Sequence, residues 1–124
     1  MKITPAEAQI MEVLWRAEEP LAIEGLRARL DEEWADGTVR AFMNRLLQKK
    51  AVAAAKDGKR SLYRALMQRS DYVVAESETF LARVFQGEAA PLVAHFVKNR
   101  RLTPDDLRQL KAIIDDLEAS DDDE

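Results

Sequence analysis

Residues 38–64 read TVRAFMNRLLQKKAVAAAKDGKRSLYR, and this stretch decides the fold. In its first half, apolar side chains recur every three or four positions, which is typical of a helix with one buried face. In its second half, Asp57-Gly58 separates two short segments, and Asp-Gly is a strong hairpin signal. Alanines 53–55 are poor strand formers, so the hairpin assignment depends on this turn and on Leu62 and Tyr63. The stretch predicts a helix followed by a β-hairpin.

The predicted helix begins near Thr38 and has two different faces. The face that we expect to be buried carries Val39, Phe42, Met43, Leu46 and Leu47. The opposite face carries Arg40, Ala41, Asn44, Arg45, Gln48 and Lys49. Arginine can hydrogen-bond to guanine in the DNA major groove, and asparagine can hydrogen-bond to adenine. The second face is therefore a candidate DNA-reading surface, and the alternative is an ordinary solvated helix face.

The distribution of charge supports the DNA interpretation. The 124-residue chain has a net charge of −4, but residues 38–64 carry eight basic side chains against Asp57 alone. The flanking residues 1–37 and 65–124 are both acidic overall. A basic block of this kind favours a polyanionic partner. The basic side chains of the block are Arg40, Arg45, Lys49, Lys50, Lys56, Lys59, Arg60 and Arg64.

Three positively charged residues flank the predicted turn. Lys56, Lys59 and Arg60 are expected to neutralise DNA phosphates without reading sequence, although a solvated hairpin tip has the same composition. Thr38 is expected to donate to a phosphate or to cap the helix, and the two roles are compatible. Lys49, near the helix end, is expected mainly to interact with the helix dipole, with phosphate contact secondary.

The sequence before this stretch predicts two further helices. Thr4-Pro5-Ala6-Glu7 has the pattern of a capped helix start, and Glu19-Pro20 ends that helix. A second helix is expected from about Ala22 until the turn-like segment at 34–37. Three helices and a hairpin in this order match a winged helix-turn-helix, in which the third helix enters the major groove and the hairpin contacts the DNA backbone.

After the hairpin, the pattern predicts three more helices, beginning near Arg69. Their apolar positions are numerous, and about 55 residues make a poor independent core, so burial against a second copy is the simplest arrangement. We expect a winged-helix domain at 1–68, a helical dimerisation domain at 69–119 and an acidic disordered tail at 120–124. The expected dimer interface comprises Phe80, Leu81, Val84, Leu92, Val93, Phe96, Val97, Leu110, Ile113, Ile114 and Leu117.

Several classes of function are excluded or unsupported by composition. The chain has no Cys and a single His, His95, so a thiolate metal site or a disulfide scaffold is excluded and a zinc site is not expected. Neither a nucleophile with its base nor a glycine-rich phosphate loop is recognisable, so we expect no enzyme and no cofactor. Because no apolar run approaches the roughly 20 residues that span a bilayer, we expect a cytoplasmic protein without direct membrane insertion.

Several segments of the chain together resemble the penicillinase-repressor family of bacterial winged-helix regulators, which includes the BlaI, MecI and CopY relatives. The resemblance covers roughly residues 3–117. The segments that carry it are ITPAE at 3–7, IMEVLW at 10–15, TVR at 38–40, NRL at 44–46, KRSLY at 59–63, RVF at 83–85, LVA at 92–94 and FV at 96–97. The resemblance implies a homodimeric repressor on a palindromic operator.

Relatives in this family are released from DNA by a membrane sensor-protease pathway or, in the copper-responsive branch, by a metal. The resemblance therefore implies that one of these two routes could release this protein. The copper-responsive branch uses a C-terminal cysteine motif, which this chain lacks. The cleaved relatives are cut between Asn and Phe, and the aligned pair here is His95-Phe96, the candidate cleavage site. Relatives often have Lys-Thr where this chain has Arg40-Ala41.

The sequence therefore predicts a DNA-binding transcriptional repressor that acts as a homodimer. The expected DNA-binding residues are Thr38, Arg40, Ala41, Asn44, Arg45, Lys49, Lys56, Lys59 and Arg60. Two alternatives stay open at this point. One is a winged-helix regulator that responds to a small molecule, and the other is a protein-interaction module that keeps the fold without binding DNA.

Overall fold

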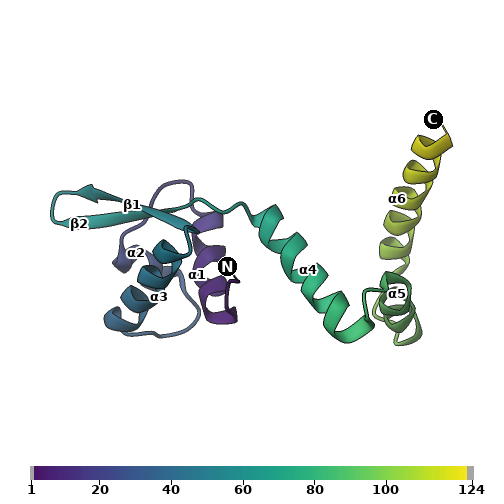
Figure 1. The fold of residues 1–124 in the computed structure, drawn as a ribbon, viewed down its shortest axis with the longest axis horizontal. Helices are drawn as coiled ribbons and strands as arrows, with labels where there is room; N and C mark the ends of the chain where they lie inside the picture. Colours follow the sequence, from purple (N-terminus) through teal and green to yellow (C-terminus); the bar gives the residue numbers. More distant parts are fainter. Residues whose placement is uncertain (1, 123–124) are drawn as a thin grey trace. The chain divides into compact units, whose positions relative to one another are not determined.

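The computed structural model describes residues 2–122, which form six helices and one hairpin in two units (Figure 1). Unit 1 ends at Glu76 and unit 2 begins at Ser77. The elements are α1 (Pro5–Arg16), α2 (Ile23–Arg29), α3 (Asp36–Gln48), β1 (Val52–Asp57), β2 (Arg60–Ala65), α4 (Arg69–Phe85), α5 (Ala89–Lys98) and α6 (Pro104–Asp122). This order confirms the mainly helical fold class with a winged helix-turn-helix.

Helix α1 begins with the capping box that its sequence predicts. The Thr4 hydroxyl accepts a hydrogen bond from the Glu7 backbone N–H at 3.2 Å, and the Glu7 carboxylate accepts one from the Thr4 N–H at 2.8 Å. Two backbone donors that the helix cannot satisfy internally thus gain partners. The same logic operates before α6, where Thr103 and Asp106 exchange hydrogen bonds of 3.0 and 2.9 Å.

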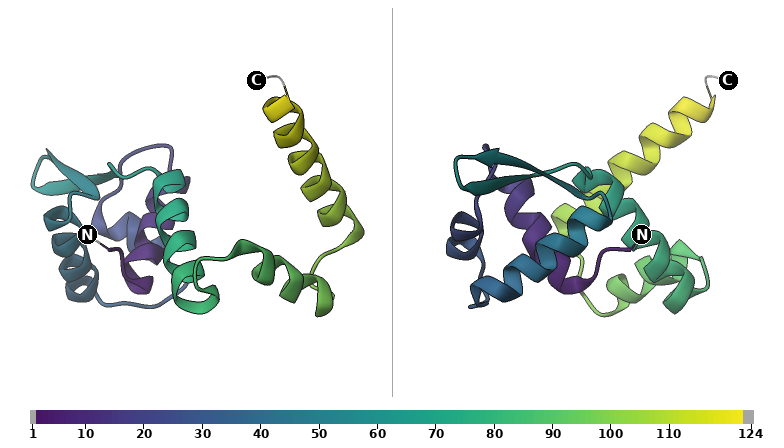
Figure 2. Two further views of the ribbon diagram at one scale, coloured as in Figure 1. Left: turned by 45° about the vertical axis from the view of Figure 1, so that its right-hand side comes forward. Right: turned by 60° about the vertical axis from the view of Figure 1, so that its left-hand side comes forward.

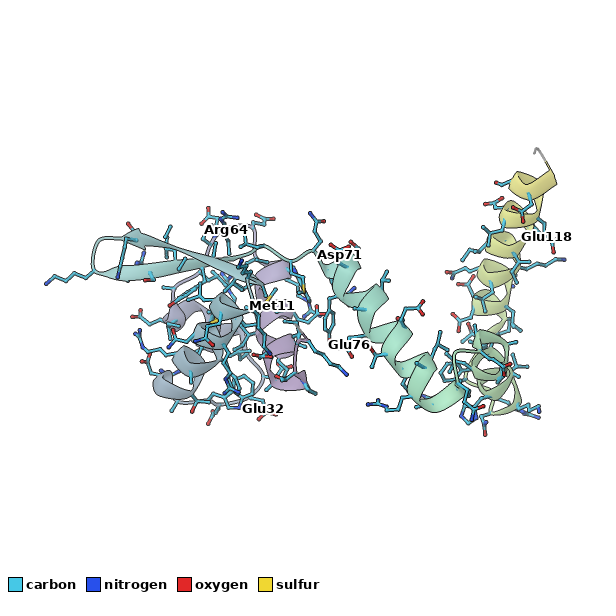
Figure 3. The ribbon with its side chains drawn as sticks, viewed as in Figure 1. Met11, Glu32, Arg64, Asp71, Glu76 and Glu118 are labelled. Carbon is cyan, nitrogen blue, oxygen red and sulfur yellow. The ribbon has the colours of Figure 1, made fainter. Side chains whose placement is uncertain are left out.

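The core of unit 1 is formed by α1, α2, α3 and the base of the hairpin. Figure 3 shows Met11 among the side chains of these helices, and Met11 has no exposed surface. Trp15 and Trp34 lie partly buried at the edge of this core. The fully buried side chains include Ile10, Met11, Leu26, Val39, Met43, Leu46 and Val52.

The hairpin is a two-stranded antiparallel sheet with Val52 opposite Ala65 and Asp57 opposite Arg60. Asp57 is thus the last residue of β1, and the loop consists of Gly58 and Lys59. Gly58 has φ +67°, which suits the first central position of a two-residue hairpin turn. All views place the hairpin along one side of α1–α3 (Figures 1 and 2).

A short pairing between the α1–α2 loop and the hairpin was not expected from the sequence. The Leu21 N–H donates to the Tyr63 carbonyl at 2.9 Å, and the Tyr63 N–H donates to the Leu21 carbonyl at 2.8 Å. Leu21 and Tyr63 are both buried. This pairing attaches β2 to the helical core and so fixes the base of the hairpin relative to the helices of unit 1.

Helix α3 begins two residues before the expected Thr38. Its first residue is Asp36, and Ala35 occupies the N-cap without a side-chain hydrogen bond. Thr38 therefore lies inside the first turn and is not the cap. Asp36 favours this earlier start because a carboxylate in the first turn interacts well with the helix dipole.

Unit 2 contains the remainder of α4 together with α5 and α6. The described residues of this unit include no buried side chain, although the faces of its helices are rich in apolar residues. Helix α6 extends through Asp122, so residues 120–122, expected in a disordered tail, are helical. The rest of that expected tail, residues 123–124, lies outside the described residues.

Candidate nucleic-acid interface

The two faces of α3 are arranged as the sequence predicts. Val39, Met43 and Leu46 are fully buried, whereas Phe42 and Leu47 are half-buried at the edges of the face. The opposite face is solvent-exposed and comprises Thr38, Arg40, Ala41, Asn44 and Arg45. Five of the predicted DNA-binding residues thus share one exposed surface, which we call the α3 polar face.

Arg40 is held on this face by a carboxylate one turn before it. Its Nε donates to Oδ2 of Asp36 at 2.5 Å, and the two side chains are 60% and 48% exposed. The hydrogen bond from Arg40 to Asp36, followed by the negative charge of Asp36, raises the pKa of Arg40. Arg40 is therefore a cation whose direction is restrained before any ligand arrives.

Arg45 is held differently, against an aromatic ring. Its guanidinium carbon lies 4.8 Å from the centre of the Phe42 ring, which is a cation–π contact. The Phe42 ring in turn lies 5.1 Å from the ring of Trp34, and the Trp34 carbonyl accepts a hydrogen bond from Arg27 Nε at 2.9 Å. Arg45 is thus connected to α2 through successive contacts of Phe42, Trp34 and Arg27.

Lys49 lies apart from the α3 polar face. Its Nζ donates to Glu7 Oε1 at 2.5 Å and to the Lys2 carbonyl at 2.8 Å, and its side chain is largely buried. The pKa of Glu7 would be raised by burial, but hydrogen bonds from Lys49 and Thr4 lower it below its ordinary value. Lys49 is one of the predicted DNA-binding residues, but its ammonium group is directed towards the protein interior.

The hairpin carries the remaining predicted phosphate contacts. Lys56 and Lys59 are exposed, and neither forms an ion pair or hydrogen bond with any described residue. Arg60 pairs with Asp57 across the turn, with Nη2 at 3.1 Å from Oδ2. Figure 3 labels Arg64, which lies farther along β2 and is also exposed. The hairpin can therefore present positive charge to a polyanion without rearranging its backbone.

Two residues near these sites were missed by sequence reasoning. The sequence pattern places Asp36 in a turn, although a carboxylate four residues before Arg40 is the ordinary spacing of a helical ion pair. The sequence pattern predicts only a capping role for Glu7, and nothing in the sequence signals its contact with Lys49, which lies 42 residues away.

The predicted dimer-interface residues all lie on the helices of unit 2. Leu81, Leu92 and Leu110 are half-buried. The exposed members are Phe80, Val84, Val93, Phe96, Val97, Ile113, Ile114 and Leu117. This is a large amount of exposed apolar surface, of the kind that marks an interaction site.

The candidate cleavage site, His95-Phe96, lies within α5. The His95 carbonyl accepts hydrogen bonds from the Asn99 N–H at 3.1 Å and from Asn99 Nδ2 at 2.8 Å. The Phe96 carbonyl accepts one from the Arg101 N–H at 2.9 Å. The bond between these residues therefore lies in the last turn of α5, where the Phe96 carbonyl accepts a helix-capping hydrogen bond.

Neither a metal site nor a membrane-spanning helix is found among the described residues, 2–122. Within this range no group of three or more His, Cys, Asp or Glu side chains is arranged to hold a metal ion. None of the described helices combines the length and apolar character that crossing a membrane would require.

Comparison with known proteins identifies the family. The sequence model described as penicillinase repressor matches residues 3–116. The methicillin resistance regulatory protein MecI of Staphylococcus aureus strain N315 is 28% identical over 116 residues, covering 91% of this chain and 93% of MecI. The penicillinase repressor of Bacillus licheniformis is 26% identical over 116 residues, covering 93% of this chain and 91% of the repressor.

A solved structure of a relative is similar as well. It is the solution structure of monomeric Bacillus licheniformis BlaI in complex with the blaP half-operator, with a TM-score of 0.50 and 26% identity. The match covers 58% of this chain and 89% of the BlaI chain. Together with the match over nearly the whole sequence, it shows that this chain belongs to the penicillinase repressor family.

Proposed function

We propose that this member of the penicillinase repressor family is a transcriptional repressor that binds palindromic operator DNA as a homodimer. The α3 polar face is the observation that carries the proposal, because it presents Arg40, Asn44 and Arg45 on the exposed side of a helix whose other side is buried. The third helix of a helix-turn-helix is the element that enters the major groove. The similarity to BlaI bound to a half-operator supports the same assignment.

Each part of the interface has a separate role in this proposal. The side chains of the α3 polar face contact bases, with Ala41 against a base methyl group and Thr38 donating to a phosphate at the start of the helix. Lys56, Lys59 and Arg60 on the hairpin bind phosphates and supply affinity that depends on salt. Lys49 stabilises the end of α3 from within, and its contribution to DNA binding is through that stability.

The homodimer is supported by the exposed apolar side chains of α4, α5 and α6. Burying them against a second copy would remove apolar surface from water, which is the main driving force of stable association. A two-fold dimer would also place two α3 helices on successive major grooves of a palindrome. The proposal places the protein in the cytoplasm, where bacterial operators lie.

Release of the repressor by a membrane sensor-protease pathway is the final part of the proposal. Proteases bind extended backbone, so cleavage at His95-Phe96 requires local unfolding of α5. The short length of α5, ten residues, favours such opening. Cleavage there would separate α6 from the rest of the chain and so remove part of the dimer interface.

Binding-site selection tests the proposal directly. A random pool of duplexes is selected with the full chain, and the anisotropy of the selected duplex is titrated against that of a scrambled duplex at two salt concentrations. We expect tight, salt-dependent binding to the selected duplex and much weaker binding to the scrambled one. If no DNA sequence is enriched although the protein is folded and dimeric, the result would favour a protein-interaction role. Loss of binding on adding a small molecule to intact protein would favour a ligand-responsive regulator.

A pair of variants locates the reading surface. Arg45→Ala should weaken binding to the selected duplex by about tenfold, because one well-oriented arginine contact to a base has that order of effect. Arg16→Ala removes an exposed arginine outside the basic block, at the end of α1, and should leave affinity unchanged. Equal effects of the two variants would contradict the assignment of α3.

A further inference from the structure

The ion pair between Asp36 and Arg40 joins the first residue of α3 to the α3 polar face. Asp36 is the first residue of the helix and Arg40 the fifth, so the two side chains lie one above the other. The contact uses Nε of Arg40 and Oδ2 of Asp36. Both side chains are largely exposed, and an exposed pair of this kind contributes little to folding stability.

The geometry of the pair leaves the two terminal nitrogens of the Arg40 guanidinium available to bind a base. An arginine has five N–H donors, one on Nε and four on the two terminal nitrogens. Only the Nε donor is used by Asp36, and the terminal nitrogens form no hydrogen bond or ion pair with another described residue, although Glu24 and Tyr63 also interact electrostatically with Arg40. These nitrogens form the fork that binds O6 and N7 of guanine in the major groove. Asp36 therefore fixes one edge of Arg40 and leaves the opposite edge for a base.

The position along α3 also favours a base over a phosphate. In helix-turn-helix proteins, the N-terminal residues of the recognition helix contact the base edges. Arg40 lies in this part of α3, whereas Arg45 lies more than one turn later and rests on Phe42. Of the two arginines, Arg40 is the one restrained by a carboxylate.

A carboxylate on a DNA-binding surface also has an electrostatic cost. Asp36 repels the phosphates, although as the first residue of α3 it also interacts favourably with the helix dipole. An unrestrained arginine side chain, by contrast, can turn to the nearest phosphate and bind any sequence. The carboxylate opposes that rotation, because it attracts the guanidinium and repels the backbone.

We propose that Asp36 is a positioning residue that directs Arg40 to a guanine and so sets part of the base preference of α3. This inference rests on the proposed function, and it concerns one base pair within each half-site. In this proposal Asp36 increases the preference for one base pair, whereas its negative charge lowers the affinity for DNA of any sequence. Removing Asp36 should weaken discrimination at that base pair while strengthening binding to unrelated DNA.

The experiment compares the full-length wild type with Asp36→Ala and Arg40→Ala on the duplex that wild-type protein selects. Each base pair of a half-site is replaced in turn, and the ratio of dissociation constants gives the preference at that position. We expect both variants to lose preference at the same G·C pair: Arg40→Ala by about tenfold, the order of one bidentate contact, and Asp36→Ala by about twofold, the order of one exposed helical ion pair. Replacing that guanine with 7-deazaguanine should weaken the wild type, should weaken Asp36→Ala less, and should leave Arg40→Ala unaffected.

The chain offers a matched control in Asp57→Ala. This substitution also removes a carboxylate paired with an arginine, in this case Arg60 on the hairpin. Both aspartate variants should bind scrambled duplex more tightly than the wild type, because each removes a negative charge near phosphates. Only Asp36→Ala should lose base preference. Thermal unfolding of each variant checks that the fold is retained.

Three results would overturn the inference. One is full retention of the wild-type preference in Asp36→Ala, and another is a uniform loss of affinity for selected and scrambled duplexes, which indicates a purely structural role. The third is a loss of preference at an A·T pair. A wild type that shows no preference at any position would instead overturn the proposed function together with this inference.

Discussion

Nζ of Lys49 lies 2.5 Å from Oε1 of Glu7, which joins the end of α3 to the first turn of α1. The Glu7 side chain has no exposed surface, and its Oε2 has no hydrogen-bond partner among the described residues. The Lys2 carbonyl accepts a second hydrogen bond from the Lys49 ammonium at 2.8 Å. The capping residue of α1 is therefore also the counter-ion that holds the far end of the proposed recognition helix.

The first prediction concerns stability. Lys49→Met leaves the Glu7 carboxylate buried without a cation, so the free energy of unfolding should fall by about 3 kcal/mol, as for other buried pairs that lose one partner. Denaturant titration followed by circular dichroism measures this change. Lys50→Met removes the neighbouring exposed lysine and should have little effect. Similar unfolding midpoints for the two variants would contradict the role of the ion pair.

The second prediction concerns pH. Because the pKa of Glu7 in the folded protein is below its ordinary value of 4.5, the unfolded chain binds this proton more readily. The stability contributed by Glu7 should be complete above pH 4.5 and should disappear as the pH falls below it. Unfolding midpoints measured across this range should show a shallower dependence in Glu7→Gln than in the wild type. Glu12→Gln, which removes a partly exposed carboxylate of α1, is the control for charge. An unchanged slope in Glu7→Gln would refute the assignment.

The third prediction separates phosphate contacts from base contacts. Lys59→Ala should weaken binding to selected and scrambled duplexes by the same factor, and the slope of log affinity against log salt should decrease by about 1. Arg45→Ala should reduce the difference between the two duplexes instead. Titrations at several salt concentrations measure both quantities. A loss of sequence preference in Lys59→Ala would mean that the hairpin reads bases.

The fourth prediction concerns the dimer. Leu117 is 62% exposed in the single chain, so Leu117→Glu should not disturb the folding of the chain, yet a charge there should oppose association. Sedimentation should give a monomer, and binding to the selected palindrome should weaken sharply. Leu66→Glu alters an exposed leucine between the hairpin and α4 and should remain dimeric. If Leu117→Glu stays a dimer, the interface lies elsewhere.

Much of the fold could be predicted because its signals are local. The Thr4 and Glu7 pair that starts α1 needs only a spacing of three residues, and the hairpin at Gly58 needs only the conformational freedom of glycine. The burial of Val39, Met43 and Leu46 follows from helical spacing. Helix α3 starts two residues before the predicted position, because Asp and Gly, found at 36 and 37, are also common in turns and so obscure the helix start.

The candidate site was only partly predictable from the same information. The residues of the α3 polar face could be named because helical spacing decides which positions share a face. What each side chain contacts could not be named, since that depends on rotamers and neighbours. Arg40 and Arg45 look equivalent in the sequence, but one rests against a carboxylate and the other against an aromatic ring.

The sequence by itself determined the order of elements, the exposed face of α3 and the concentration of positive charge on residues 38–64. These properties depend on residue spacing and composition, which act over a few positions. Only the tertiary structure decided that Lys49 turns to Glu7 and that Leu21 pairs with Tyr63 on the hairpin. Both contacts join residues about 42 positions apart, so they exist only once the packing of the apolar core brings those segments together.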